Sequence, residues 1–182
     1  MILLAAAAVL AGCGKAAPAE PEFNDTEFND TEFNDTDVMF LQMSLEYARQ
    51  GDEVAALAES RGGTAEVRML GTGLRAQWDT ESATMRSWLL GWQRPLTADP
   101  SAHAGHGDPR SLRPSDVAEL RATKAADFDR TALTLLVGHL HNCVEVTRME
   151  SAGGRYPPAK ALAATMTQAR QADIQRMLRL LA

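Results

Sequence analysis

The chain carries a weak internal repeat at an offset of 92 residues, and this repeat constrains its fold more than any other feature. The residues that match between the halves are Asp37 and Asp129, Leu41 and Leu133, Glu53-Val54 and Glu145-Val146, Gly62 and Gly154, Leu70 and Leu162, Met85 and Met177, and Leu89 and Leu181. Each half reads as one helical hairpin, which alone would leave an apolar face in water. Packing the two hairpins together buries both faces, so the repeat predicts a pseudo-twofold four-helix bundle.

Helical periodicity covers nearly all of the repeated region. Aromatic residues make up only 5% of the chain and Val and Ile are few, which favours helices over sheet. We expect long helices over about 38–59, 65–92, 125–150 and 157–182, with a short helix over 115–121. The predicted bundle spans 35–182, with halves 35–92 and 125–182 and a linker over 93–124. Its predicted fold class is all-α.

The first ten residues are uniformly apolar. This run is too short to span a bilayer, which needs about twenty residues, but it matches the apolar region of a secretory signal. The sequence Leu10-Ala11-Gly12-Cys13 follows and resembles the lipobox of bacterial lipoproteins. The resemblance implies a signal peptide over 1–12, lipidation of Cys13, and a lipid-anchored protein on the outer side of the cell membrane. The alternative is a buried N-terminal helix with an incidental cysteine.

Residues 13–34 are expected to form a charged tether that begins at Cys13 and leads to the bundle. A five-residue unit beginning Phe-Asn-Asp-Thr occurs three times in succession, over 23–27, 28–32 and 33–37. Its period suits neither helix nor strand, so it either lengthens a tether or repeats a binding epitope. Residues 14–37 hold one lysine and eight acids, whereas 38–182 hold 17 basic and 16 acidic residues. The net charge of −6 therefore belongs to the tether, and it argues against nucleic-acid binding.

Several motifs of the two halves carry a family resemblance. They are Phe33-Asn34-Asp35-Thr36-Asp37, Gln42-Met43-Ser44-Leu45-Glu46, Glu81-Ser82-Ala83-Thr84-Met85-Arg86-Ser87-Trp88-Leu89, Phe128-Asp129-Arg130, Cys143-Val144-Glu145-Val146 and Asp173-Ile174-Gln175-Arg176-Met177. Over residues 33–182 the chain resembles the bacterial "domain of unknown function 305" family of exported proteins. The resemblance implies a ferritin-like four-helix fold and copper handling. The family has a His-His pair in each half. Here Tyr47-Ala48 and His139-Leu140 stand at those places, so only His139 of the four histidines is kept.

A copper site in the bundle would use His139 first. Cys143 lies four residues further on and shares its helix face, and both residue types bind soft or borderline metals. Three methionines at family-like positions are candidates to complete a Cu(I) site, namely Met43, Met85 and Met177. The competing interpretation is that the cysteine and methionines simply pack the core.

The remaining candidates for chemistry are weaker. His141 is expected on another helix face, pointing to solvent, and His103 and His106 lie with Asp108 in a loop that could hold a divalent ion weakly. We expect no enzyme, because Glu-x-x-His motifs, phosphate loops and dinucleotide fingerprints are absent from the sequence. Two hypotheses follow: a lipid-anchored copper-binding protein, or a metal-free bundle that serves as an interaction or accessory subunit of a membrane protein complex.

Overall fold

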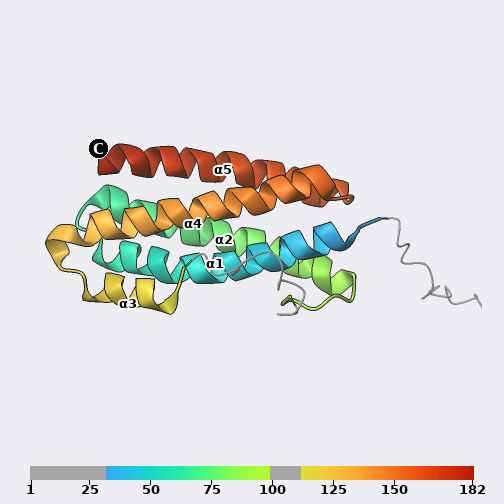
Figure 1. Ribbon diagram of the computed structural model, residues 1–182, viewed down its shortest axis with the longest axis horizontal. Coiled ribbons are helices and arrows are strands. Elements are labelled where there is room, and N and C mark those ends of the chain that lie inside the picture. Colours follow the sequence, from blue (N-terminus) through green and yellow to red (C-terminus); the bar gives the residue numbers. More distant parts are fainter. Residues whose placement is uncertain (1–31, 99–111) are drawn as a thin grey trace, which may run out of the picture.

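The protein is an all-helical bundle made of two antiparallel hairpins. The structure is a computed structural model that describes residues 32–98 and 112–182. The first hairpin consists of α1 (Asp35–Arg61) and α2 (Ala65–Gly91), and the second of α4 (Ala125–Gly153) and α5 (Pro157–Leu181) (Figure 1). A short helix, α3 (Pro114–Ala122), precedes the second hairpin. The described residues contain no strand, so the predicted all-α four-helix fold is confirmed.

The first helices of the two hairpins form the centre of the bundle. α1 packs along α4 in the opposite direction, while α2 packs on α1 and α5 packs on α4 (Figure 1). α3 lies against α1 and α4. The core combines leucines with small alanines, and its largest fully buried apolar side chains are Phe40, Phe128, Leu41, Leu74, Met85, Leu89, Leu120, Leu133, Leu136, Leu140 and Met177. Within 32–98 and 112–182, none of the helices combines the length and the apolar character that crossing a membrane requires.

Two aspartates related by the repeat join the halves. Asp37 on α1 accepts hydrogen bonds from two successive main-chain N–H groups just before α5, and Asp129 on α4 accepts them from two just before α2. The donors are Arg155 and Tyr156 for Asp37, at 2.9–3.1 Å, and Gly63 and Thr64 for Asp129, at 2.8 and 3.2 Å. Every partner in one set lies 92 residues from its counterpart in the other. Each half therefore caps the second helix of the other half, as a pseudo-twofold arrangement requires.

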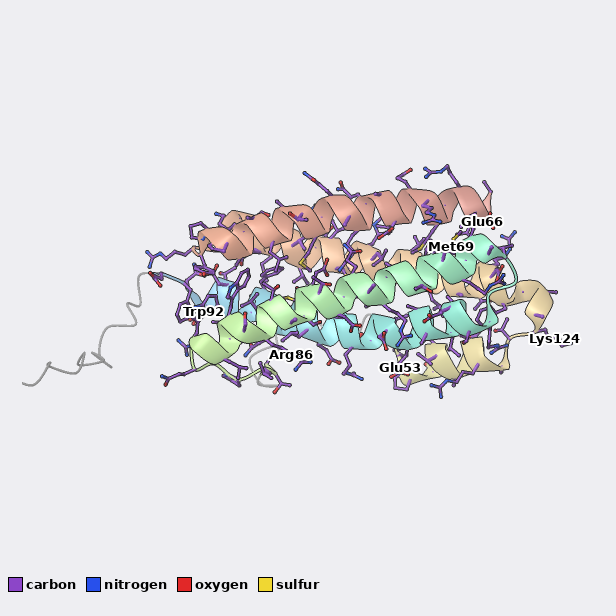
Figure 2. The ribbon with its side chains drawn as sticks, turned by 180° about the vertical axis from the view of Figure 1, so that it is seen from behind. Glu53, Glu66, Met69, Arg86, Trp92 and Lys124 are labelled. Carbon is purple, nitrogen blue, oxygen red and sulfur yellow. The ribbon has the colours of Figure 1, made fainter. Side chains whose placement is uncertain are left out.

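The third Phe-Asn-Asp-Thr unit is part of the folded bundle. Phe33 stacks on Trp92 with ring centroids 4.2 Å apart, at the end of the bundle opposite Lys124 (Figure 2). Asn34 caps α1 and donates from its side chain to the main-chain carbonyl of Gly153, at 2.8 Å. The first unit, Cys13 and the expected signal peptide lie outside the described residues.

Candidate functional site

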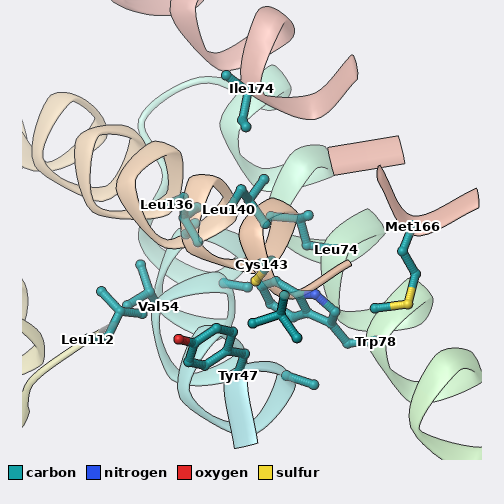
Figure 3. Packing of buried hydrophobic residues seen from close by; sticks show 14 of the residues in the cluster. Tyr47, Val54, Leu74, Trp78, Leu112, Leu136, Leu140, Cys143, Met166 and Ile174 are labelled. Atoms are coloured by element: carbon teal, nitrogen blue, oxygen red, sulfur yellow. The ribbon is translucent and has the colours of Figure 1, made fainter. Parts of the chain in front are cut away.

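The centre of the bundle buries a histidine next to a cysteine. His139 is 1% exposed and Cys143 is 6% exposed, and Nε2 of His139 lies 3.7 Å from Sγ of Cys143. Tyr47 and Trp78 present their rings to the imidazole edge to face, with centroids 5.7 and 5.9 Å away. Figure 3 shows Cys143 beside Trp78, with Tyr47 and Leu140 also near it in this view. The helical spacing thus brings these two predicted donors together.

Burial keeps the imidazole of His139 neutral. It lowers the pKa of His139 to about 4, although a hydrogen bond with the Tyr47 main chain acts in the opposite direction. At neutral pH one ring nitrogen therefore carries a proton and the other offers a lone pair. In the tautomer with the proton on Nδ1, the lone pair of Nε2 is directed to the side of the ring that faces Cys143. A neutral imidazole is the form that binds metal ions.

The thiol of Cys143 is also uncharged. Burial raises the pKa of Cys143 to about 12, so the group is a protonated thiol at neutral pH. A buried, protonated thiol is a poor nucleophile. It becomes a strong soft ligand only when a metal ion displaces its proton.

A buried ion pair lies beside this histidine and cysteine. Arg170 on α5 is 1% exposed and donates from Nη2 to the carboxylate of Glu81 on α2. Its guanidinium lies 5.8 Å from the centre of the Trp78 ring and favours the thiolate form of Cys143. Burial raises the pKa of Glu81, which the Arg170 charge opposes. In the described residues, Nε and Nη1 of Arg170 have no hydrogen-bond partner.

Sequence reasoning missed this ion pair, although one signal was present. Arg170 falls on the apolar stripe of α5, whose other buried members are Ala159, Ala163, Met166, Ile174 and Met177. A charged residue at a core position needs a buried partner of opposite charge. Its partner is 89 positions away in the sequence, so local spacing does not reveal it.

The repeat explains why these residues meet. Tyr47 is the repeat counterpart of His139, and the other pairs of counterparts are Gly51 with Cys143, Trp78 with Arg170, and Glu81 with Asp173. Counterparts touch in two of these pairs, Tyr47 with His139 and Trp78 with Arg170. The site therefore lies where the pseudo-twofold axis crosses the bundle. Gly51 makes room for it, because a Cβ there would lie 2.5 Å from Trp78 and 2.6 Å from His139.

The three predicted methionines lie elsewhere. Met43 is half-buried and lines a pocket of about 690 Å³ between α1 and α3. Met85 and Met177 are fully buried. Met85 lies seven residues beyond Trp78 on α2, and Met177 lies seven residues beyond Arg170 on α5, which is about 10 Å along each helix. Since α2 and α5 run in opposite directions (Figure 1), these two methionines lie to opposite sides of the centre. The structure thus brings together two of the five predicted donors.

The other predicted positions add no ligand near His139. Tyr47, Ala48 and Leu140, where the family's other histidines would stand, are buried core residues. His141 is exposed, as its position on another face predicts, and His103 and His106 lie outside the described residues. Across 32–98 and 112–182, no three His, Cys, Asp or Glu side chains are grouped so that they could hold a metal ion.

The histidine–cysteine pair nevertheless lies within reach of a single metal ion. Bonds of about 2.3 Å to sulfur and about 2.0 Å to nitrogen reach across at most about 4.3 Å, and the observed 3.7 Å lies within this limit. Two donors are too few for the tetrahedral four-ligand site that structural zinc prefers. One thiolate and one imidazole suit a soft ion with a low coordination number, such as Cu(I).

These features define a four-helix bundle, built from two related hairpins, with a soft donor pair at its centre. The family model described as "Domain of unknown function (DUF305)" matches residues 37–181. The chain therefore belongs to the DUF305 family, and the resemblance seen in its motifs is confirmed.

Solved structures share this fold. A DUF305 fragment from Deinococcus radiodurans is 21% identical, with a TM-score of 0.70, covering 81% of this chain and 96% of the other. A putative secreted DUF305 protein from Streptomyces coelicolor is 19% identical, with a TM-score of 0.74, covering 80% and 91%. CopM in its Cu(II)-bound form is 20% identical, with a TM-score of 0.69, covering 80% and 95%. At these identities the likeness establishes the fold alone. The comparison with curated proteins gave no match.

Proposed function

We propose that the protein binds copper as Cu(I), with His139 and Cys143 as the ligands. The observation that carries the proposal is the 3.7 Å approach of Nε2 and Sγ in the buried interior of the bundle, which keeps the imidazole neutral. Thiolate sulfur selects soft ions, and imidazole also suits copper. Structures of CopM, a protein with a similar fold, with Cu(II), Cu(I) and Ag bound support the proposal.

The proposal extends to the place where copper would be bound. The apolar run 1–10 and the Leu10-Ala11-Gly12-Cys13 sequence support export and lipidation at Cys13. Acyl chains on a tether would hold the bundle at the outer side of the cell membrane. Mass spectrometry of the mature N-terminus tests this part, because a diacylated or triacylated Cys13 supports it and an unmodified Cys13 contradicts it.

The copper site is tested by competition titration of Cu(I) against a chelator of known affinity. Wild type is expected to bind one Cu(I) more tightly than micromolar, and His139→Ala/Cys143→Ser is expected to lose this binding. His141→Ala is the matched control, since it removes an exposed histidine two residues from His139 on the same helix. Equal affinity of wild type and the double variant would remove the proposed site.

A metal-free function is the second candidate. Core residues at Tyr47, Ala48 and Leu140 replace three family histidines, which favours a bundle that has lost its metal and serves as an interaction or accessory subunit of a membrane protein complex. The same titration separates the two candidates. Elemental analysis of the protein purified from copper-supplemented cells gives an independent answer.

A further inference from the structure

The buried charge next to the donor pair is unusual for a cation site. Arg170 contributes a permanent positive charge, and its guanidinium acts on both proposed ligands, favouring the thiolate form of Cys143 and opposing a positive charge on His139. A second positive charge at this position has no water to screen it, because Arg170 and His139 are each 1% exposed.

The two carboxyl groups near Arg170 do not offset a further charge. Glu81 already receives the hydrogen bond from Nη2 of Arg170, so it neutralises the guanidinium and no more. Asp173, the repeat counterpart of Glu81, is half-buried and interacts with the positive charges of both Arg170 and Arg176, so its carboxylate is already balanced by arginine. The centre of the bundle is thus close to neutral before any metal binds.

The valence of the metal decides the charge after binding. A metal ion that binds Cys143 breaks the S–H bond, forms an S–metal bond and releases one proton to solvent. A monovalent ion then takes the place of the released proton, which carries the same charge, so the interior stays neutral. A divalent ion leaves an additional positive charge beside Arg170, which is costly in a buried environment.

We propose that the Arg170–Glu81 pair makes the His139–Cys143 site selective for soft monovalent ions, Cu(I) and Ag(I), against divalent ions. This inference rests on the proposed copper binding and adds a specificity-determining residue that contacts no metal. Arg170 stabilises the thiolate–metal bond for either valence, but it penalises the surplus charge of a divalent ion alone.

The test compares Ag(I) and Zn(II) affinities in the full chain carrying Cys13→Ser, which leaves one thiol. Binding at the site is defined as the difference from the same chain with His139→Ala/Cys143→Ser, so that other histidines are subtracted. In Arg170→Gln, which removes the guanidinium charge, we expect Zn(II) affinity to rise at least tenfold relative to Ag(I). Arg170→Lys retains the positive charge, so its ratio of Zn(II) to Ag(I) affinity should stay within about threefold of the wild-type ratio.

Two further variants keep the result interpretable. Glu81→Met/Arg170→Met replaces the pair by apolar residues, a change that buried ion pairs often tolerate, and should shift the ratio at least threefold in the same direction. Arg75→Gln, in an exposed ion pair of α1 and α2, should leave the ratio unchanged. If Arg170→Gln binds Ag(I) tightly and its ratio of Zn(II) to Ag(I) affinity equals that of wild type, the proposed role of Arg170 in selectivity is overturned, but the proposed copper binding is not. Absence of both Ag(I) and Cu(I) binding in wild type overturns the proposed function itself.

Discussion

Glu150 on α4 and Asp37 on α1 bring two fully buried carboxyl groups together where the chain enters the bundle. The oxygens of Asp37 accept main-chain hydrogen bonds from Asn34, Arg155 and Tyr156. In the part of the chain that the structure describes, the oxygens of Glu150 accept none. Burial, followed by the proximity of Asp37, raises the pKa of Glu150 to about 8. Glu150 is therefore protonated at neutral pH.

This carboxyl pair predicts a loss of stability as the pH rises. The folded protein holds the Glu150 proton up to a pKa of about 8, whereas the unfolded chain releases it near the ordinary glutamate pKa of 4.5. The stabilisation is fully present below pH 4.5 and is lost as the pH rises through 8. When the pH rises from 6.5 to 8, we expect the free energy of unfolding of wild type to fall by about 1–2 kcal/mol relative to that of Glu150→Gln. Urea unfolding measures both.

The chosen pH range isolates Glu150 from His139. The pKa of His139 is lowered from 6.5 to about 4. Its titration therefore lowers the stability of the fold only when the pH falls below 6.5. Glu145→Gln, on an exposed position of α4, is the control and should keep the wild-type pH profile. Parallel profiles for wild type and Glu150→Gln would contradict the assignment.

Gly51 and Gly138 form a matched pair of helical glycines with opposite expected effects. In Gly51→Ala the new methyl group would meet Trp78 and His139 at about 2.5 Å, so overpacking should cost about 1–3 kcal/mol. In Gly138→Ala the methyl group has no heavy atom within 4 Å, and the higher helix propensity of Ala should add about 0.5–1 kcal/mol. Thermal unfolding of the two variants measures both signs, and a neutral Gly51→Ala would refute the tight contact.

Cys143 should resist alkylation in the folded protein. Its thiol is buried and its pKa is raised to about 12, so iodoacetamide at pH 7.5 should label it at least a hundredfold more slowly than in the chain unfolded by urea. Mass spectrometry of the Cys13→Ser chain follows the reaction at this single thiol. Labelling at equal rates in native buffer and urea would show that the centre of the bundle is open.

Removal of the Asp129 carboxylate should weaken the junction between the halves. Asp129→Ala takes away the acceptor for two N–H groups at the start of α2, a change that typically costs about 1–2 kcal/mol at a helix N-terminus. Asp79→Ala, on the exposed middle of α2, removes the same charge without a cap and should change stability by less than about 0.5 kcal/mol. Chemical unfolding of the two variants compares them directly.

Local pattern and internal repeat predict most of the fold. Helical periodicity gives the four long helices and the short one, because each helix presents one apolar face to the core. Helix ends follow from residues such as Thr64, which caps α2, and from the prolines that begin α5. The i,i+4 spacing also predicts that His139 and Cys143 share a face, because it depends on one helix alone.

Contacts between distant residues explain what the sequence does not predict. The pairing of Arg170 with Glu81 depends on how α2 and α5 face each other, and the space left by Gly51 depends on which side chains cross above it. The placement of Met85 and Met177 depends on the relative directions of α2 and α5, which the pattern of apolar residues in the sequence does not reveal. A repeat predicts that two residues are equivalent, but only the assembled bundle decides whether equivalent residues meet.

The exchanged aspartate caps tie the stability of each hairpin to the presence of the other. Asp37 completes the start of α5, and Asp129 completes the start of α2, so neither hairpin contains all the acceptors that its own second helix needs. Either hairpin on its own would therefore leave the start of its second helix without these carboxylate acceptors.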